Sequence, residues 1–220
     1  TQITCKPAAS GAGKDQAWIV TVGSQQSTAS SDTTSYTAPA VTAFDPTVYS
    51  TSTATTVTIT GTNFGVVGAT NAVSATYQNT ALSNLAGSSY TATGCAVSVA
   101  HTKITCTSVA DGVGHALKWK VEVGDQESAE SSATTSYAAP AITGLSGLSS
   151  FKTDGTDEAL VTITGTNFGP KEGTPANPVS AVYQNSELSS AYAKSEFTAQ
   201  DCVVSDAHTQ ITCKPAASGA

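Results

Sequence analysis

The chain is internally repetitive. Residues 1–12 and 209–220 are identical, and the stretch VTITGTNFG at 57–65 occurs again at 161–169. Repeats of this kind are typical of arrays in which each copy is one structural unit. The two twelve-residue segments begin 209 − 1 = 208 residues apart. We therefore interpret the chain as one 208-residue period of a longer array, followed by twelve residues of the next copy.

The repeats divide the chain into three parts. Residues 39–139 are predicted to form one complete domain, and residues 140–220 the first part of a second, similar domain. Residues 1–38 match the end of the complete unit, because WIVTVG at 18–23 corresponds to WKVEVG at 119–124. We expect 1–38 to hold the last strands of a domain that begins outside the chain, and 140–220 to be completed by the next repeat.

This interpretation predicts one local fold for both twelve-residue copies. Residues 1–12 and 209–220 should have the same conformation, displaced by one period. Different conformations would count against the filament interpretation and place the receptor-like alternative, given below, ahead of it.

The hydrophobic pattern predicts β-strands. Val57 and Ile59 point to one face of their segment, and Thr58 and Thr60 to the other. Alternation with a period of two, interrupted by turn residues roughly every 8–12 positions, is typical of the strands of a β-sandwich. No segment follows the 3.6-residue period of a helix. The predicted fold class is all-β, with tandem sandwiches in a repeat array.

The cysteines predict a disulfide in each unit. Cys95 and Cys106 lie 11 residues apart, and so do Cys202 and Cys213. Equal spacing in equivalent segments indicates one bond within each hairpin. Cys5 is expected to be unpaired, because its partner would precede the start of the chain. Disulfides at this density indicate an oxidising compartment, and their spacing does not match the paired ligands of a zinc site.

The charge of the chain argues against nucleic-acid binding. The net charge is −7 and there is no arginine, whereas phosphate contacts rest on Lys and Arg. The sequence also contains no apolar run long enough to span a bilayer.

Several motifs together resemble one known family. They are APAVTAF and APAITGL at the start of the units, VTITGTNFG, the C-x10-C pair ending in ITC, and the closing SY-x-x-P. Nearly the whole chain is similar to the TIG or IPT domains of plexins, other surface receptors and microbial surface proteins. The resemblance implies immunoglobulin-like sandwiches without shared catalytic residues or cofactors. The disulfides and the lack of arginine favour the tandem extracellular branch over the transcription-factor branch.

Four side chains are candidates for a functional role. His101 and His208 occupy equivalent turns, where solvent exposure is a better interpretation than a metal or catalytic role. Trp18 and Trp119 occupy equivalent strands and are expected to pack over a sandwich core or an inter-domain seam. No nucleophile-elbow motif supports a Ser-His-Asp arrangement.

Two surface segments have alternative interpretations. The segment 152–160 concentrates Asp154, Asp157 and Glu158, and we favour a solvated acidic loop over a calcium site. The Ser/Thr-rich tracts before the last strand of each unit either carry O-linked glycans or are bare polar loops.

These observations predict a structural role. We expect a repeat unit of a long extracellular or cell-surface filament, stalk or hair, whose partners are neighbouring copies of the same repeat. It is not expected to be an enzyme or to bind a cofactor. The alternative is an adhesin or receptor ectodomain that binds protein or glycan through loops at the sandwich ends.

Overall fold

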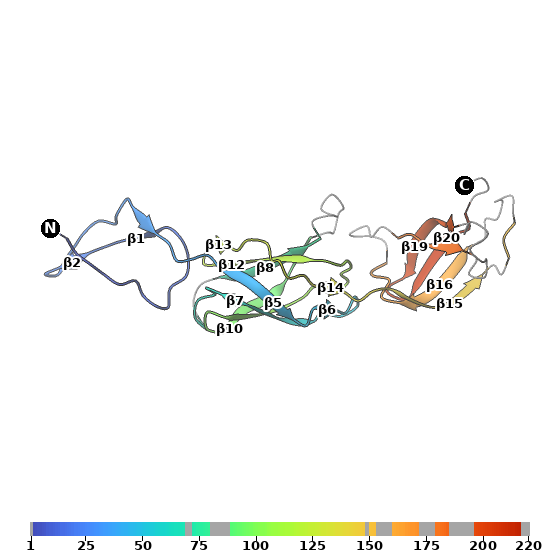
Figure 1. Ribbon diagram of the computed structural model, residues 1–220, viewed down its shortest axis with the longest axis horizontal. Coiled ribbons are helices and arrows are strands. Elements are labelled where there is room, and N and C mark those ends of the chain that lie inside the picture. Colours follow the sequence, from blue (N-terminus) through green and yellow to red (C-terminus); the bar gives the residue numbers. More distant parts are fainter. Residues whose placement is uncertain are drawn as a thin grey trace, which may run out of the picture.

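The computed structural model describes residues 2–68, 72–79, 89–147, 150–152, 160–171, 179–184 and 196–216. The regular structure in these ranges is entirely β, so the all-β prediction is confirmed. Three parts lie in a row along the long axis of the molecule (Figure 1). They are an N-terminal part up to residue 38, a central sandwich, and a C-terminal part that begins near residue 140.

The central part is a sandwich of two four-stranded sheets. One sheet has the order β10-β11-β7-β5 and the other β13-β12-β8-β9, and both are antiparallel. A short parallel pair of β14 and β6 closes one end. The strands are β5 (Ala40–Asp45), β6 (Val48–Tyr49), β7 (Thr56–Thr62), β8 (Val73–Gln78), β9 (Ser89–Thr91), β10 (Thr93–Val99), β11 (Lys103–Thr107), β12 (Lys118–Val123), β13 (Gln126–Glu127) and β14 (Ser136–Tyr137).

Aromatic side chains fill the centre of this sandwich. Trp119 on β12 is fully buried and stacks on Tyr77 of β8, with ring centroids 4.2 Å apart. Phe44 of the opposite sheet lies 5.3 Å from the Trp119 ring. Tyr49 meets the same indole edge-on at 6.3 Å. This packing joins the two sheets through one residue, Trp119.

Two of the buried tyrosine hydroxyls, those of Tyr77 and Tyr137, share one hydrogen-bond network. The hydroxyls of Tyr77 and Tyr137 lie 2.7 Å apart, and Tyr137 donates to the carbonyl of Val109. The Val109 backbone N–H donates in turn to the Tyr77 oxygen. Burial raises the pKa of both tyrosines above the ordinary value, because the phenolate would lose its hydration.

The C-terminal part repeats only some of these strands. It contains β15 (Ala141–Gly147), β16 (Val161–Thr166), β17 (Val182–Gln184), β18 (Glu196–Thr198), β19 (Gln200–Asp206) and β20 (Gln210–Lys214). The order β15-β16-β20-β19 reproduces β5-β7-β11-β10, and the β17–β18 pair reproduces β8 and β9. Strands equivalent to β12, β13 and β14 do not occur in the described residues that follow β20.

The N-terminal part contains the converse set. Its short strands are β1 (Gln16–Ala17), β2 (Thr21–Val22), β3 (Gln25–Gln26) and β4 (Thr33–Thr34). Their pairings, Gln16 with Thr34 and Val22 with Gln25, recur 101 residues later as Leu117 with Thr135 and Val123 with Gln126. Residues 13–38 therefore have the local form of the β12–β14 region without a sandwich beneath them.

The repeated motif VTITGTNFG needs its first glycine. A Cβ atom on Gly61 would meet the Ala40 carbonyl oxygen and the Phe64 ring, and one on Gly165 would meet the equivalent atoms of Ala141 and Phe168. Glycine thus lets the phenylalanine fold over its own strand into the core.

The two identical twelve-residue segments differ in structure. Residues 210–214 form β20 between β16 and β19, whereas residues 2–8 form no strand. The prediction of one shared conformation is wrong for this chain. The reason is that a strand needs neighbouring backbone to satisfy its amides, and no strand among the described residues pairs with residues 2–8.

Candidate functional site

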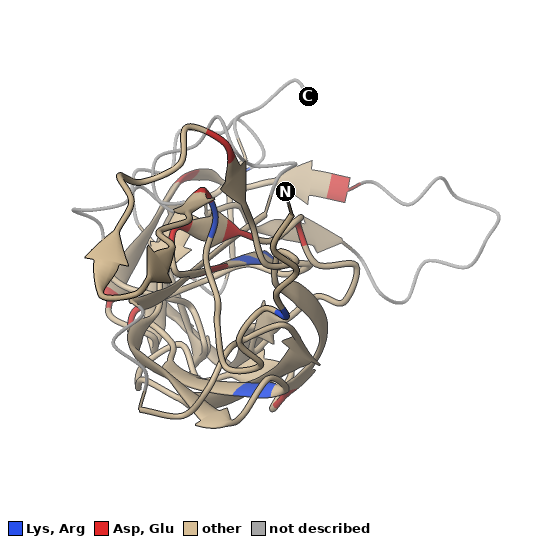
Figure 2. Cartoon of the chain, turned by 90° about the vertical axis from the view of Figure 1, so that its left-hand side faces the viewer, with Lys and Arg blue, Asp and Glu red and all other residues tan. Residues whose placement is uncertain are grey.

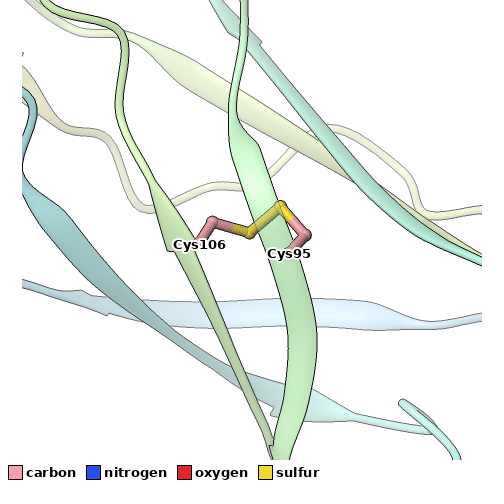
Figure 3. The surroundings of a disulfide bond; sticks show 2 residues. All are labelled: Cys95 and Cys106. Atoms are coloured by element: carbon pink, nitrogen blue, oxygen red, sulfur yellow. A yellow bond between two sulfur atoms is a disulfide. The ribbon is translucent and has the colours of Figure 1, made fainter.

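The cysteines are placed in equivalent hairpins. Cys95 bonds Cys106 between β10 and β11 (Figure 3), and Cys202 bonds Cys213 between β19 and β20. In both pairs the Cα atoms lie 4.1 Å apart. Cys5 is free and exposed. The two disulfides fit an oxidising environment.

The two histidines differ in environment. His101 is exposed. The side chain of His208 is only 16% exposed, because its turn faces the end of the central sandwich. Its Nδ1 lies 3.2 Å from the Thr51 hydroxyl, and its Nε2 lies 3.0 Å from an oxygen of Asp111. The prediction of an exposed turn residue is therefore wrong for His208, which lies in the seam between two units.

The linkers between parts are held in the same way at both joints. The side-chain amide of Asn63 donates to the carbonyl of Ala38 at 3.0 Å, and that of Asn167 donates to Ala139 at 3.0 Å. Both asparagines have a left-handed backbone conformation, with φ of 62° and 61°. The asparagine of the VTITGTNFG motif thus holds the linker that enters each unit by a hydrogen bond.

The environments of the two tryptophans distinguish the N-terminal part from the central part. Trp119 is completely buried, as predicted for a core residue, whereas Trp18 is 41% exposed. The indole N–H of each donates to an equivalent threonine, Trp18 to Thr34 at 2.9 Å and Trp119 to Thr135 at 2.8 Å. The expectation that Trp18 packs over a core is wrong here, because no counterpart of β8 lies beneath it in the described part of the chain.

An open apolar groove marks the C-terminal part. Its volume is about 480 Å³. Leu145 is 69% exposed, whereas Phe44 at the equivalent register position is 8% exposed. The other apolar side chains around the groove include Ile142, Phe151, Val161, Ile163, Phe168, Val182 and Tyr183. The groove lies where the central sandwich places β12 and its tryptophan.

The described residues offer few groups for chemistry. They contain no cluster of three or more metal-binding side chains, and Asp154, Asp157 and Glu158 lie outside the described ranges. Lysine and acidic residues are sparse and scattered along the ribbon (Figure 2). No helix in the described ranges is long and apolar enough to cross a membrane. The described residues therefore offer a binding partner apolar side chains and strand edges more readily than charged groups.

A comparison with known families agrees with the central sandwich. Residues 39–138 match the IPT/TIG domain. No curated protein matches the chain. The matched IPT/TIG domain covers both four-stranded sheets, so the immunoglobulin-like fold expected from the sequence is confirmed for this part.

The sequence predicted an unfinished domain in residues 140–220, but the position of the groove and the His208 contact were not predicted. Periodicity finds the strands of the C-terminal part but does not reveal which side of them is uncovered. One signal was available, since the WIVTVG segment and its tryptophan occur before the IPT/TIG domain and have no copy after residue 169.

Proposed function

We propose that the chain is a structural repeat unit of a long extracellular filament, stalk or surface hair built from alternating IPT/TIG-like domains. The observation that carries the proposal is the repeated joint. Asn63 and Asn167 hold the linkers at Ala38 and Ala139 with the same hydrogen bond. A linker hydrogen bond that recurs at both joints favours a regular array.

Further contacts support a stiff row of units. The central sandwich meets the C-terminal part through the contacts of His208 with Thr51 and Asp111. It meets the N-terminal part through the Gln126 amide, which donates to the Tyr36 carbonyl at 2.8 Å. Such contacts restrict bending at linkers of only a few residues. The proposed role requires no catalytic group or cofactor, only neighbouring copies of the repeat.

The alternative is an adhesin or receptor ectodomain. The observation that supports an adhesin or receptor is that residues 2–8 and 210–214 have different conformations. They have a sufficient cause in the missing partner strands, so we place the filament first.

Electron microscopy of the native material tests the proposal. Two domains per period, each about 30–40 Å long, predict an axial repeat of up to about 80 Å per 208 residues in a straight array. Native molecules without an axial repeat, in which these domains connect to an unrelated tip, would contradict the filament and favour the receptor.

A further inference from the structure

We propose that the groove of the C-terminal part is a docking site for residues 13–38 of a second copy of this chain. This inference rests on the proposed function and names the partner of the groove. One copy would supply the strands that the groove of the other copy lacks.

The donated segment already has the required shape. In this segment, backbone amides donate hydrogen bonds to serine hydroxyls. The same bonds recur in the central sandwich 101 residues later. The Trp18 N–H donates to Ser30 Oγ at 2.8 Å, and the Trp119 N–H donates to Ser131 Oγ at 2.9 Å. The same holds for Val20 with Ser27 and for Val121 with Ser128, at 3.0 Å in both cases. Docking would therefore need little rearrangement of the segment, which lowers its entropic cost.

The segment presents apolar side chains without a cover. Trp18, Val20 and Val22 are 41%, 38% and 66% exposed, whereas their counterparts Trp119, Val121 and Val123 are at most 1% exposed. The exposed fractions differ because a second sheet covers these side chains only in the central sandwich. The local conformation is the same in both segments. Exposed apolar stripes on a strand are typical of surfaces that bind another strand.

The groove supplies the matching surface. Tyr183 stacks on Phe197 at 5.4 Å, as Tyr77 stacks on Tyr90 at 5.1 Å. The Tyr183 oxygen accepts from the Ala216 N–H at 3.1 Å, as the Tyr77 oxygen accepts from Val109. The aromatic and hydroxyl groups that receive Trp119 and Tyr137 in the central sandwich thus have equivalents here.

The central sandwich also predicts the register. There, Trp119 pairs with Tyr77 and Val121 with Ala75. The same pairing sets Trp18 of the donor against Tyr183, and Val20 against Ala181. The indole would then cover Leu145, as Trp119 covers Phe44. The acceptor contributes its own residues 210–216, so the donated part begins near residue 13.

One position departs from the pattern. Gln16 occupies the place of the buried Leu117, and its amide donates to the Lys14 carbonyl at 3.1 Å. This position of the donated segment is therefore more polar than its counterpart, and the contact depends on Trp18, Val20 and Val22.

Because donor and acceptor surfaces are different parts of the chain, the contact is head-to-tail and, in a straight row of units, lets copies add one after another. The full 220-residue chain should form an open series of oligomers as its concentration rises in sedimentation velocity. As the oligomers form, the part of the tryptophan fluorescence that acrylamide can quench should disappear. Trp119 is buried throughout, whereas Trp18 becomes buried on docking. A chain that stays monomeric up to its solubility limit, or that stops at a dimer, would overturn the inference.

Two neighbouring substitutions provide a matched test. Val20→Lys and Ile19→Lys make the same change at adjacent exposed β-branched residues. Ile19 corresponds to the solvent-facing Lys120, and Val20 to the buried Val121. We expect Val20→Lys to abolish the oligomer series and Ile19→Lys to leave it unchanged. Equal effects of the two variants would show non-specific association and overturn the docking site.

Failure of this inference leaves the proposed function open to its own test. A monomeric 220-residue chain alongside a native filament with an axial repeat would refute docking between separate chains only. Native material without a repeat would refute the filament, whatever the chain does in the centrifuge.

Discussion

Single residues control how each unit closes over its core. Glycines in the VTITGTNFG motif and near the end of the unit lie against aromatic rings. A Cβ on Gly61 would meet the Phe64 ring and the Ala40 carbonyl, and one on Gly112 would meet the Tyr137 ring. At these positions the smallest side chain allows the largest ones to be buried.

Gly61→Ala should lower the free energy of unfolding of the central sandwich by about 1–3 kcal/mol, because the strand and the Phe64 ring must separate to admit a methyl group. Chemical denaturation followed by the near-UV signal of Trp119 measures the change. Gly144→Ala is the control, since a Cβ there meets nothing within 4 Å. An unchanged free energy of unfolding for Gly61→Ala would contradict the packing argument.

The buried tyrosines predict alkaline unfolding. Burial raises the pKa of Tyr49, Tyr77, Tyr90 and Tyr137 in the folded state. Each keeps its proton when folded but loses it when unfolded above the ordinary pKa of about 10. Their stabilising effect is thus complete below about pH 10, and above it the free energy of unfolding falls by about 1.4 kcal/mol per pH unit for each tyrosine.

Thermal unfolding at a series of pH values checks this expectation. The midpoint for the central sandwich should stay level on the neutral side of about pH 10 and fall steeply above it. A midpoint that stays constant well into the alkaline range would mean that these phenols are solvated in the folded state.

At the scale of elements, the hairpin with its disulfide is the most regular feature of both units. Cys95 and Cys106 join β10 and β11, which together form one side of a four-stranded sheet. A register shift between Thr93 and Ala96 places Cys95 in a bulge of β10. The disulfide thus links the two strands of the β10–β11 hairpin at this bulge, next to the pairing of β11 with β7.

Replacing both Cys95 and Cys106 by Ala should destabilise the central sandwich by about 3 kcal/mol, mainly because the unfolded chain gains freedom. Denaturant titration of the double variant measures the loss, and the variant with Cys5→Ala serves as the control because Cys5 is free and exposed. An unchanged midpoint for the double variant would show that the β10–β11 ladder alone holds the hairpin.

At the scale of the whole molecule, one complete core lies between two incomplete parts. Among the described residues, the core cluster of the central sandwich has 17 buried hydrophobic residues, whereas the C-terminal cluster has four. The apolar residues Trp18, Val22, Ile142 and Leu145 remain exposed at the two ends. The stability of the isolated chain therefore resides in the central part.

A fragment of residues 39–139 should fold without its neighbours. Its thermal midpoint should lie within about 4 °C of the central transition of the full chain, because the contacts with other parts involve a few hydrogen bonds at the rim. Calorimetry of the two proteins makes the comparison, and their NMR spectra should overlay for the sandwich core. A fragment that does not fold would show that the core depends on the flanking parts.

The sequence was sufficient for the features that depend on local pattern. Alternating Val57 and Ile59 predicted a half-buried strand, the 11-residue cysteine spacing predicted one hairpin bond per unit, and the motifs predicted the IPT/TIG-like sandwich. Even the hydrogen bonds around Trp18 and Trp119 are alike, because the same side chains bond the same nearby backbone groups.

Features that depend on distant partners were not predictable from local pattern. Residues 2–6 and 210–214 have the same sequence, yet only the second segment is a strand, because only it lies between β16 and β19. Trp18 and Trp119 have the same local bonds, yet only Trp119 is buried, because β8 and Phe44 lie beneath it. An extended backbone satisfies its amides, and an apolar side chain leaves water, only through segments far away in the chain.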